Sequence, residues 1–161
     1  MKKIIIIVLL SLMALIPAVY LYNSYQSQEP FRCDTQIKTL ITMQDRENLA
    51  LILHITVVFT SPEKGDLVAT GSLTGGKKDY IVSRKVTFET KHSALSGINK
   101  TTINSEVRHE IDDVPDEIWQ KYIMPEKIGV EFYLETKRLN KNAVLIKGLS
   151  NPYFVCTRSN H

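Results

Sequence analysis

The sequence lacks the motifs by which most small enzymes and metal proteins are identified. It has no glycine-rich phosphate-binding loop, no zinc-ligand spacing and no nucleophile-elbow motif. Its four histidines, His54, His92, His109 and His161, are scattered along the chain, and His54 falls on the polar side of an alternating segment. We therefore expect no catalytic residues, no cofactor and no bound metal, and we interpret the protein as a non-enzyme.

An excess of charge of one sign is also missing from most of the chain. The 20 basic and 17 acidic residues give a net charge of +3, and Lys2 and Lys3 supply part of this excess. From Phe31 to the end the charges nearly cancel, so the sequence offers no broad basic surface for nucleic acid. We expect no direct contact with nucleic acid.

Residues 4–22 form the one long run without charge. A helix of this length spans about 28 Å, close to the roughly 30 Å hydrocarbon core of a bilayer. Lys2 and Lys3 precede the run and the next basic residue is Arg32, so the positive-inside rule places the amino terminus in the cytoplasm. We predict a single-pass anchor with the remainder of the chain on the other side of the membrane.

A cleaved signal peptide is the alternative for this run. Its apolar region is usually shorter and ends in a small-x-small cleavage site, whereas bulky residues follow here at 19–22. The predicted organisation is therefore a cytoplasmic tail (1–3), a transmembrane helix (4–22), a linker (23–30) and one domain outside the cytoplasm (31–161).

Cysteine is scarce, with only Cys33 and Cys156 in the chain. Because the predicted compartment is oxidising, we expect them to form one disulfide, and two free buried thiols are the alternative. Closing so long a loop stabilises a domain by about 4 to 5 kcal/mol in the chain-entropy model. Neither cysteine lies in a motif for a catalytic thiol.

Alternation of apolar and polar residues dominates the chain after residue 30. It is strongest from Leu49 to Phe59, where every second residue is apolar. The same period predicts strands at residues 31–41, 49–60, 67–73, 79–91, 100–111, 128–138, 143–149 and 153–158.

Residues 114–123 change to helical spacing. Asp113 can cap a helix, Pro115 suits its first position and Pro125 ends it. The acidic residues here are candidates for a cation site, but no metal-binding pattern surrounds them and helix capping explains them. We expect one short helix to about Ile123, covering one end or face of the sheet.

About eight strands and one helix predict a mainly β (α+β) fold, either a strongly curved antiparallel sheet or a closed barrel. A two-sheet sandwich is the alternative. If Cys33 and Cys156 are joined, the first and last strands lie side by side, as barrel closure requires.

Three residues are candidates for a ligand site. Arg84 interrupts the apolar face of the strand at 79–91, and a buried guanidinium needs a carboxylate or an anionic ligand unless it reaches solvent at the barrel end. Trp119 and Tyr122 lie at helical spacing, where they either line a cavity or pack in the core.

Several segments resemble the FidL-like inner-membrane proteins of enteric bacteria. They are the lysine-started amino-terminal helix, Phe31-Arg32-Cys33, the Pro-Asp-Glu-Ile-Trp segment at 115–119 and the closing run from Gly148 to Cys156. The resemblance implies a bacterial inner-membrane protein with a periplasmic domain.

The resemblance also implies a partner, because FidL-like proteins are similar in size and topology to the ToxS-type companions of ToxR-like winged-helix regulators. In such pairs the periplasmic domains form a lipocalin-like barrel that can bind an amphipathic molecule such as a bile salt. We therefore expect an accessory subunit that forms a heterodimer with a regulator's periplasmic domain. The alternatives are a periplasmic assembly or chaperone-like envelope factor, and a periplasmic enzyme, for which the polar residues offer no convergent set.

Overall fold

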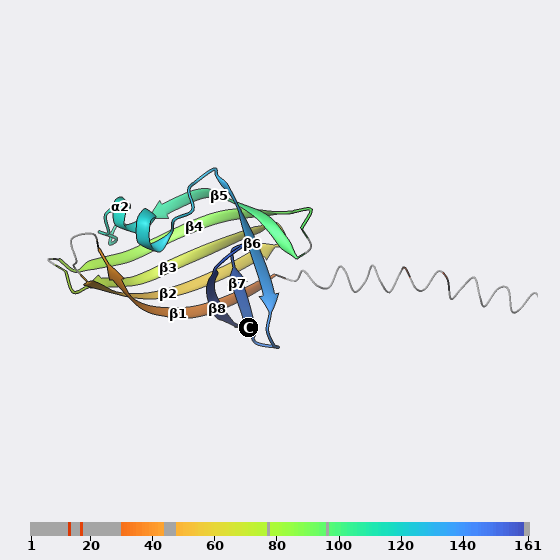
Figure 1. Ribbon diagram of the computed structural model, residues 1–161, viewed down its shortest axis with the longest axis horizontal. Helices are drawn as coiled ribbons and strands as arrows, with labels where there is room; N and C mark the ends of the chain where they lie inside the picture. Colours follow the sequence, from red (N-terminus) through yellow and green to blue (C-terminus); the bar gives the residue numbers. More distant parts are fainter. Residues whose placement is uncertain are drawn as a thin grey trace, which may run out of the picture.

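The computed structural model describes residues 30–43, 48–76, 78–95 and 97–159, together with Met13 and Pro17. Eight strands and one short helical segment make up this part of the chain (Figure 1). They are β1 (Phe31–Thr42), β2 (Asn48–Ser61), β3 (Lys64–Thr74), β4 (Tyr80–His92), β5 (Ile98–Arg108), α2 (Asp116–Ile118), the π-helical turn η1 (Trp119–Ile123), β6 (Glu131–Arg138), β7 (Ala143–Lys147) and β8 (Pro152–Arg158).

The strands close into an antiparallel barrel in the order β1-β2-β3-β4-β5-β6-β7-β8. A disulfide joins Cys33 on β1 to Cys156 on β8, with the two α-carbons 5.4 Å apart. The expectation of a mainly β fold is thus confirmed in its barrel form, and the two-sheet sandwich is excluded.

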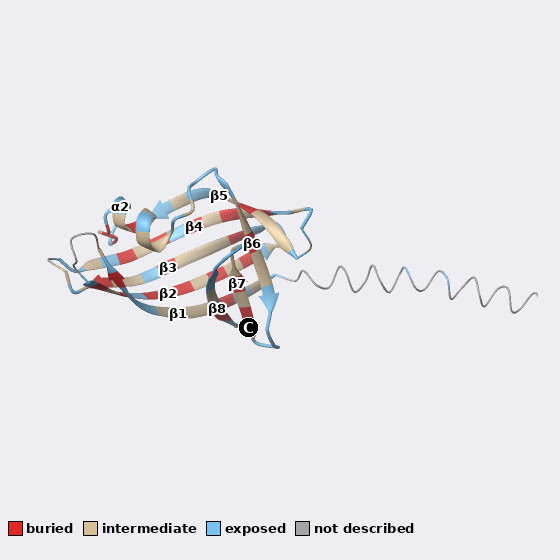
Figure 2. Cartoon of the chain, in the orientation of Figure 1, coloured by how far each residue is buried: buried red, intermediate tan, exposed pale blue. Residues whose placement is uncertain are grey.

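The alternation in β2 shows why these residues form a barrel wall. From Leu49 to Phe59 its odd-numbered side chains point inward and are buried, namely Leu49, Leu51, Leu53, Ile55, Val57 and Phe59. Its even-numbered side chains lie on the outer face, where His54 is exposed as predicted. Figure 2 shows buried positions recurring along the long strands in the same way. The strand period therefore places one continuous apolar surface inside the barrel.

The barrel is uneven in length. Strands β1 to β5 contain 11 to 14 residues, whereas β6, β7 and β8 contain 8, 5 and 7. The three short strands cross one end of the long ones (Figure 1). In the described residues, β8 pairs with β1 only through Cys33 opposite Arg158 and Asp34 opposite Thr157. Closure of the barrel is therefore confined to one end.

A bulge in β5 changes which of its side chains face inward. The register moves from Thr87 opposite Ser105 to Phe88 opposite Ile103, which leaves Asn104 as an extra residue. Because side chains alternate with a period of two, one extra residue reverses the alternation beyond it. The chain after Asn104 therefore faces the opposite way from the simple strand pattern.

The predicted strands at 100–111 and 128–138 differ from the structure in their bounds and in which residues are buried. Unbroken alternation through the predicted strand at 100–111 would place Val107 and Ile111 on the same inner face as Ile103, yet they are 60% and 57% exposed and β5 ends at Arg108. Ile128 and Val130 are 56% and 55% exposed, because a turn with φ of 77° at Gly129 precedes β6. Strand β6 therefore begins at Glu131 rather than residue 128.

The predicted helix is present over Asp116–Ile123, but Asp113 does not cap it. Pro115 occupies the N-cap position, and no side chain there accepts a backbone hydrogen bond. The Asp113 carboxylate instead accepts a 2.7 Å hydrogen bond from the Ile81 backbone N–H and pairs with Lys78 at 2.7 Å. These contacts tie the start of the helical segment to the edge of β4.

The predicted cytoplasmic tail, transmembrane helix and linker at 1–30 lie outside the described residues, except for Met13, Pro17 and Pro30. Within the described part of the chain, no helix combines the length and the apolar character that a membrane span requires.

Candidate binding cavity and the charged cluster beside it

The barrel encloses an apolar cavity of about 220 Å³. All eight strands and η1 contribute to its wall, and aliphatic and aromatic side chains form most of it. The cavity wall includes Trp119 and Tyr122, two of the three residues predicted for a ligand site, but Arg84 is not part of it. A largely apolar hollow of this kind is suited to a hydrocarbon ligand rather than to acid–base chemistry.

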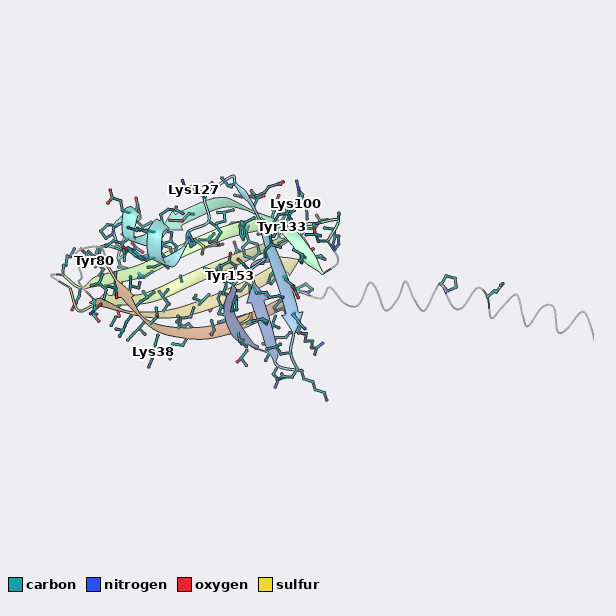
Figure 3. The ribbon with its side chains drawn as sticks, in the orientation of Figure 1. Lys38, Tyr80, Lys100, Lys127, Tyr133 and Tyr153 are labelled. Carbon is teal, nitrogen blue, oxygen red and sulfur yellow. A yellow bond between two sulfur atoms is a disulfide. The ribbon has the colours of Figure 1, made fainter. Side chains whose placement is uncertain are left out.

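One partly exposed part of the cavity wall is fixed by a hydrogen bond between β8 and the segment after η1. The Tyr153 hydroxyl donates to the Glu126 carboxylate at 2.5 Å, and both residues line the cavity. Burial and the neighbouring carboxylate of Glu126 raise the pKa of Tyr153, so the phenol remains a neutral donor. Tyr153 is 39% exposed and lies near the start of β8, so we define Glu126 and Tyr153 as the cavity mouth (Figure 3).

Arg84 lies beside the cavity at the centre of a charged cluster. Its side chain is only 2% exposed, and its Nη1 donates to Glu106 at 2.7 Å. Its Nε and Nη2 donate to the two carboxylate oxygens of Asp112 at 3.2 and 3.3 Å. Nη2 also donates to the Val114 carbonyl and lies 2.9 Å from an Asp116 oxygen.

This cluster satisfies the requirement that a buried guanidinium meet carboxylates. Burial alone lowers the pKa of Arg84, but its hydrogen bonds to Asp112 and Glu106 raise the pKa above its usual value. The Asp112 side chain is fully buried and also accepts hydrogen bonds from the backbone N–H groups of Ser83 and Val114. Arg84 therefore meets carboxylates, the first of the two partners that the sequence allowed for a buried guanidinium, and its hydrogen bonds here are to groups of the protein itself.

The cluster also orients Trp119 in the cavity wall. The Trp119 Nε1–H donates to Glu106 at 2.9 Å, and the guanidinium carbon of Arg84 lies 4.8 Å from the centre of the indole ring. The indole is buried, with 1% exposure. Arg84 and Glu106 therefore fix the position of an aromatic side chain that lines the cavity, which is how the cluster bears on binding.

Sequence reasoning missed Glu106 and Thr101. The alternating charged residues from Glu106 to Glu110 are typical of a solvated strand edge, but the bulge at Asn104 turns Glu106 toward Arg84. Thr101 on β5 is 1% exposed and lines the cavity. Its hydroxyl has no hydrogen-bond partner among the described residues. The break in alternation at Asn104-Ser105 was the one sequence signal for the bulge.

The edge of β1 beyond Asp34 is the second candidate site. The Arg32 carbonyl accepts a 3.0 Å hydrogen bond from the Ser159 N–H, so the backbone groups of even-numbered residues face β8. Gln36, Lys38 and Leu40 continue this row, and no described strand pairs with them on that side. We call these three residues the β1 edge.

The β1 edge borders the cavity. Leu40 is 74% exposed, and the side chains of Gln36 and Lys38 are also exposed on the outer face. Between them, Ile37 and Thr39 point the other way and line the cavity. A chain that pairs with this edge would therefore lie beside the cavity wall.

The comparisons with known proteins agree with the resemblance found in the sequence. No curated protein matches the chain. Residues 71–156 match the family described as FidL-like putative membrane protein, and they include the Arg84 cluster and Trp119. Because this span is more than half of the 161 residues, the chain belongs to the FidL-like family.

Proposed function

We propose that this protein is a membrane-anchored periplasmic accessory subunit that binds and stabilises the periplasmic domain of a ToxR-like membrane-bound transcriptional regulator. Family membership and the resemblance to ToxS-type subunits support the choice of partner. The observation that carries the proposal is the β1 edge, where backbone donors and acceptors lack a described strand. In this proposal residues 4–22 span the inner membrane and the amino terminus is cytoplasmic.

The β1 edge is suited to strand addition. Each of its three residues offers one N–H and one C=O on the same side, so an extended segment of the regulator can form a main-chain ladder with it. An unpaired edge is a hazard for a protein that acts alone, and Lys38 at its centre is the kind of charge that prevents pairing with unrelated chains. We therefore expect the added strand to carry an acidic side chain opposite Lys38.

The shared membrane makes a short interface sufficient. Two proteins anchored in the same bilayer meet at a raised effective concentration, which strengthens an interface of modest area. The β1 edge offers about six main-chain hydrogen bonds by the count of one donor and one acceptor per residue. We therefore expect a one-to-one heterodimer that is weaker when both periplasmic domains are cut free of their anchors.

Co-purification of the two full-length proteins from membranes tests the proposal. Lys38→Pro removes one outward backbone N–H and leaves the backbone hydrogen bonds between β1 and β2 in place. Lys38→Ala keeps this donor and serves as the matched control. We expect the wild type and Lys38→Ala to retain a ToxR-like regulator from the same organism and Lys38→Pro to lose most of it. Equal retention by all three proteins would rule out the edge, and no retention by any would rule out the partner.

A periplasmic assembly or chaperone-like factor is the second candidate function, because the β1 edge also fits capture of extended clients. The two functions differ in partner number. An accessory subunit binds one regulator at a ratio of one to one, and its deletion lowers the abundance or output of that regulator. A chaperone-like factor binds many unfolded envelope proteins, and its deletion leaves the regulator unchanged.

The cavity supports an added role in sensing a small amphipathic ligand. The resemblance suggests a bile salt as one example of such a molecule. Because Ile37 and Thr39 line the cavity between residues of the β1 edge, an occupant would contact the strand that the partner binds. Ligand binding and partner binding would then be coupled through β1.

A further inference from the structure

We infer that the cavity binds an uncharged, largely hydrocarbon molecule with a hydrogen-bonding group, such as a long-chain alcohol or a monoacylglycerol, and rejects carboxylates of the same length. This inference rests on the ligand-binding part of the proposed function. It concerns binding by this chain alone, so a test without the regulator separates its failure from failure of the partner proposal.

The wall of the cavity sets the hydrocarbon part of this ligand. Residues such as Leu51, Leu53, Val86, Phe132 and Ile146 line it, and they offer no hydrogen bonds. An apolar molecule gains free energy there by removing its own surface and that of the wall from water. A ligand with several polar groups would lose their hydration without compensation.

Thr101 sets the need for a hydrogen-bonding group. Its hydroxyl lies in the cavity wall, is buried with its side chain at 1% exposure, and has no partner among the described residues. A buried hydroxyl without a partner is unfavourable, and a threonine hydroxyl both donates and accepts. A ligand hydroxyl can either donate to the Thr101 hydroxyl or accept from it, and an ester oxygen can accept from it.

Glu126 determines which charge the ligand can carry. It is the only charged side chain in the cavity wall formed by the described residues, and in that part of the chain no basic group lies within ion-pairing distance of its carboxylate. Tyr153 donates a hydrogen bond to it but brings no positive charge. An anionic headgroup at the mouth therefore meets a like charge at reduced dielectric.

The positive charge of Arg84 does not offset this repulsion. Arg84 is outside the cavity wall, stacks against Trp119 and is paired with Glu106, Asp112 and Asp116. The cluster as a whole therefore carries no surplus positive charge that would attract an anion. The proposed ligand therefore differs from a bile salt, which is anionic.

Trp119 provides a direct probe, because it is the only tryptophan in the chain and lines the cavity. The full chain is reconstituted in phosphatidylcholine vesicles and titrated with a bromoalkanol, a bromoalkanoic acid of the same length and the corresponding bromoalkane. Bromine quenches indole fluorescence on close approach. We expect saturable quenching by the alcohol at a concentration at least about tenfold below that needed for the ionised acid.

Two near-isosteric variants test the two polar residues separately. Thr101→Val removes the hydroxyl and should weaken alcohol binding by about tenfold, the equivalent of one hydrogen bond, while bromoalkane binding is unchanged. Glu126→Gln keeps an oxygen acceptor for Tyr153 and removes the charge. It should bring acid binding close to alcohol binding and leave the alcohol unaffected.

Far-ultraviolet circular dichroism and the presence of the Cys33–Cys156 disulfide confirm that each variant is folded. Equal binding of acid and alcohol by the wild type, or a Glu126→Gln variant that still prefers the alcohol to the same extent, would overturn the charge argument. Unchanged alcohol binding by Thr101→Val would overturn the hydroxyl contact. Absence of saturable quenching by any of the three probes would overturn the ligand site itself.

Discussion

Substitution of Arg84 by methionine should destabilise the domain severely. The change keeps an unbranched apolar stem but removes every hydrogen bond that the guanidinium makes to Glu106, Asp112 and Val114. It leaves the Asp112 carboxylate, whose side chain is fully buried, without its main countercharge. Removing one partner of a buried ion pair costs about 3 to 5 kcal/mol, chiefly because the remaining charge stays buried.

Urea unfolding of residues 31–161 measures this effect, with Trp119 fluorescence as the signal. For an m-value of about 2 kcal/mol per molar urea, the unfolding midpoint of Arg84→Met should fall by roughly 2 M. Arg84→Lys should show a smaller loss, because lysine keeps the charge but not the planar fork that contacts two carboxylates at once.

A second substitution identifies the cause of the loss. In the Arg84→Met background the buried Asp112 carboxylate keeps only the partly exposed Arg108 as an ion-pair partner, so Asp112→Asn should recover part of the stability. A loss below about 1 kcal/mol for Arg84→Met, or no recovery in the double variant, would refute the argument that the buried charge dominates.

We expect three further outcomes, two from the structure and one from the predicted anchor at residues 4–22. Hydrogen bonds from Thr56 and Ser159 lower the pKa of Asp34 from its usual 3.8 to about 2, so its contribution to stability is complete above about pH 4 and is lost as the pH falls toward 2. Asp34→Asn should therefore be less stable than the wild type in urea unfolding at pH 7, by an amount that shrinks toward pH 2, and a constant difference would contradict this. Replacing both Cys33 and Cys156 by serine should lower the free energy of unfolding by about 2 to 5 kcal/mol, whereas an unchanged midpoint would show that the disulfide adds nothing. An export-dependent reporter fused after residue 40 should be active in a membrane-bound protein that keeps its amino terminus, and a soluble form beginning near residue 23 would contradict the anchor.

The barrel was predictable because its signals are local and repeated. In β2 the alternation from Leu49 to Phe59 continues without interruption, so the period alone assigns the inner face correctly. The pairing of Cys33 with Cys156 was predictable because they are the only two cysteines and the predicted compartment is oxidising. The disulfide places the first and last strands together. The helix was predictable from Pro115 and the helical spacing after it, although its cap was not.

The cluster beside the cavity was not predictable because it depends on one inserted residue. The break in alternation at Asn104-Ser105 does not by itself specify a bulge, yet the bulge turns Glu106 inward and Val107 outward. Arg84 was recognised as unusual, but its partners Asp112 and Glu106 lie 22 or more residues away in the sequence. Strand period cannot specify such a long-range pairing, which depends on the register between β4 and β5 and on the path of the chain after β5.

The β1 edge was not predictable from the sequence either. The pattern from Phe31 to Ile41 predicts a strand, and it contains nothing that says where the neighbouring strand ends. The edge follows from the short β8, which reaches β1 only at Cys33 and Asp34 in the described residues. Differences in strand length across the barrel therefore leave this part of β1 without a neighbouring strand in the described residues.

Amide hydrogen exchange on residues 31–161, with and without the periplasmic domain of a ToxR-like regulator, tests the central claim most directly. In the free domain the outward amides of Gln36, Lys38 and Leu40 should exchange rapidly, because no described strand pairs with them. We predict that formation of a one-to-one complex slows amide exchange at these three positions, while amide exchange on β3 is unchanged. Rapid exchange at all three in the presence of a saturating regulator domain would contradict it.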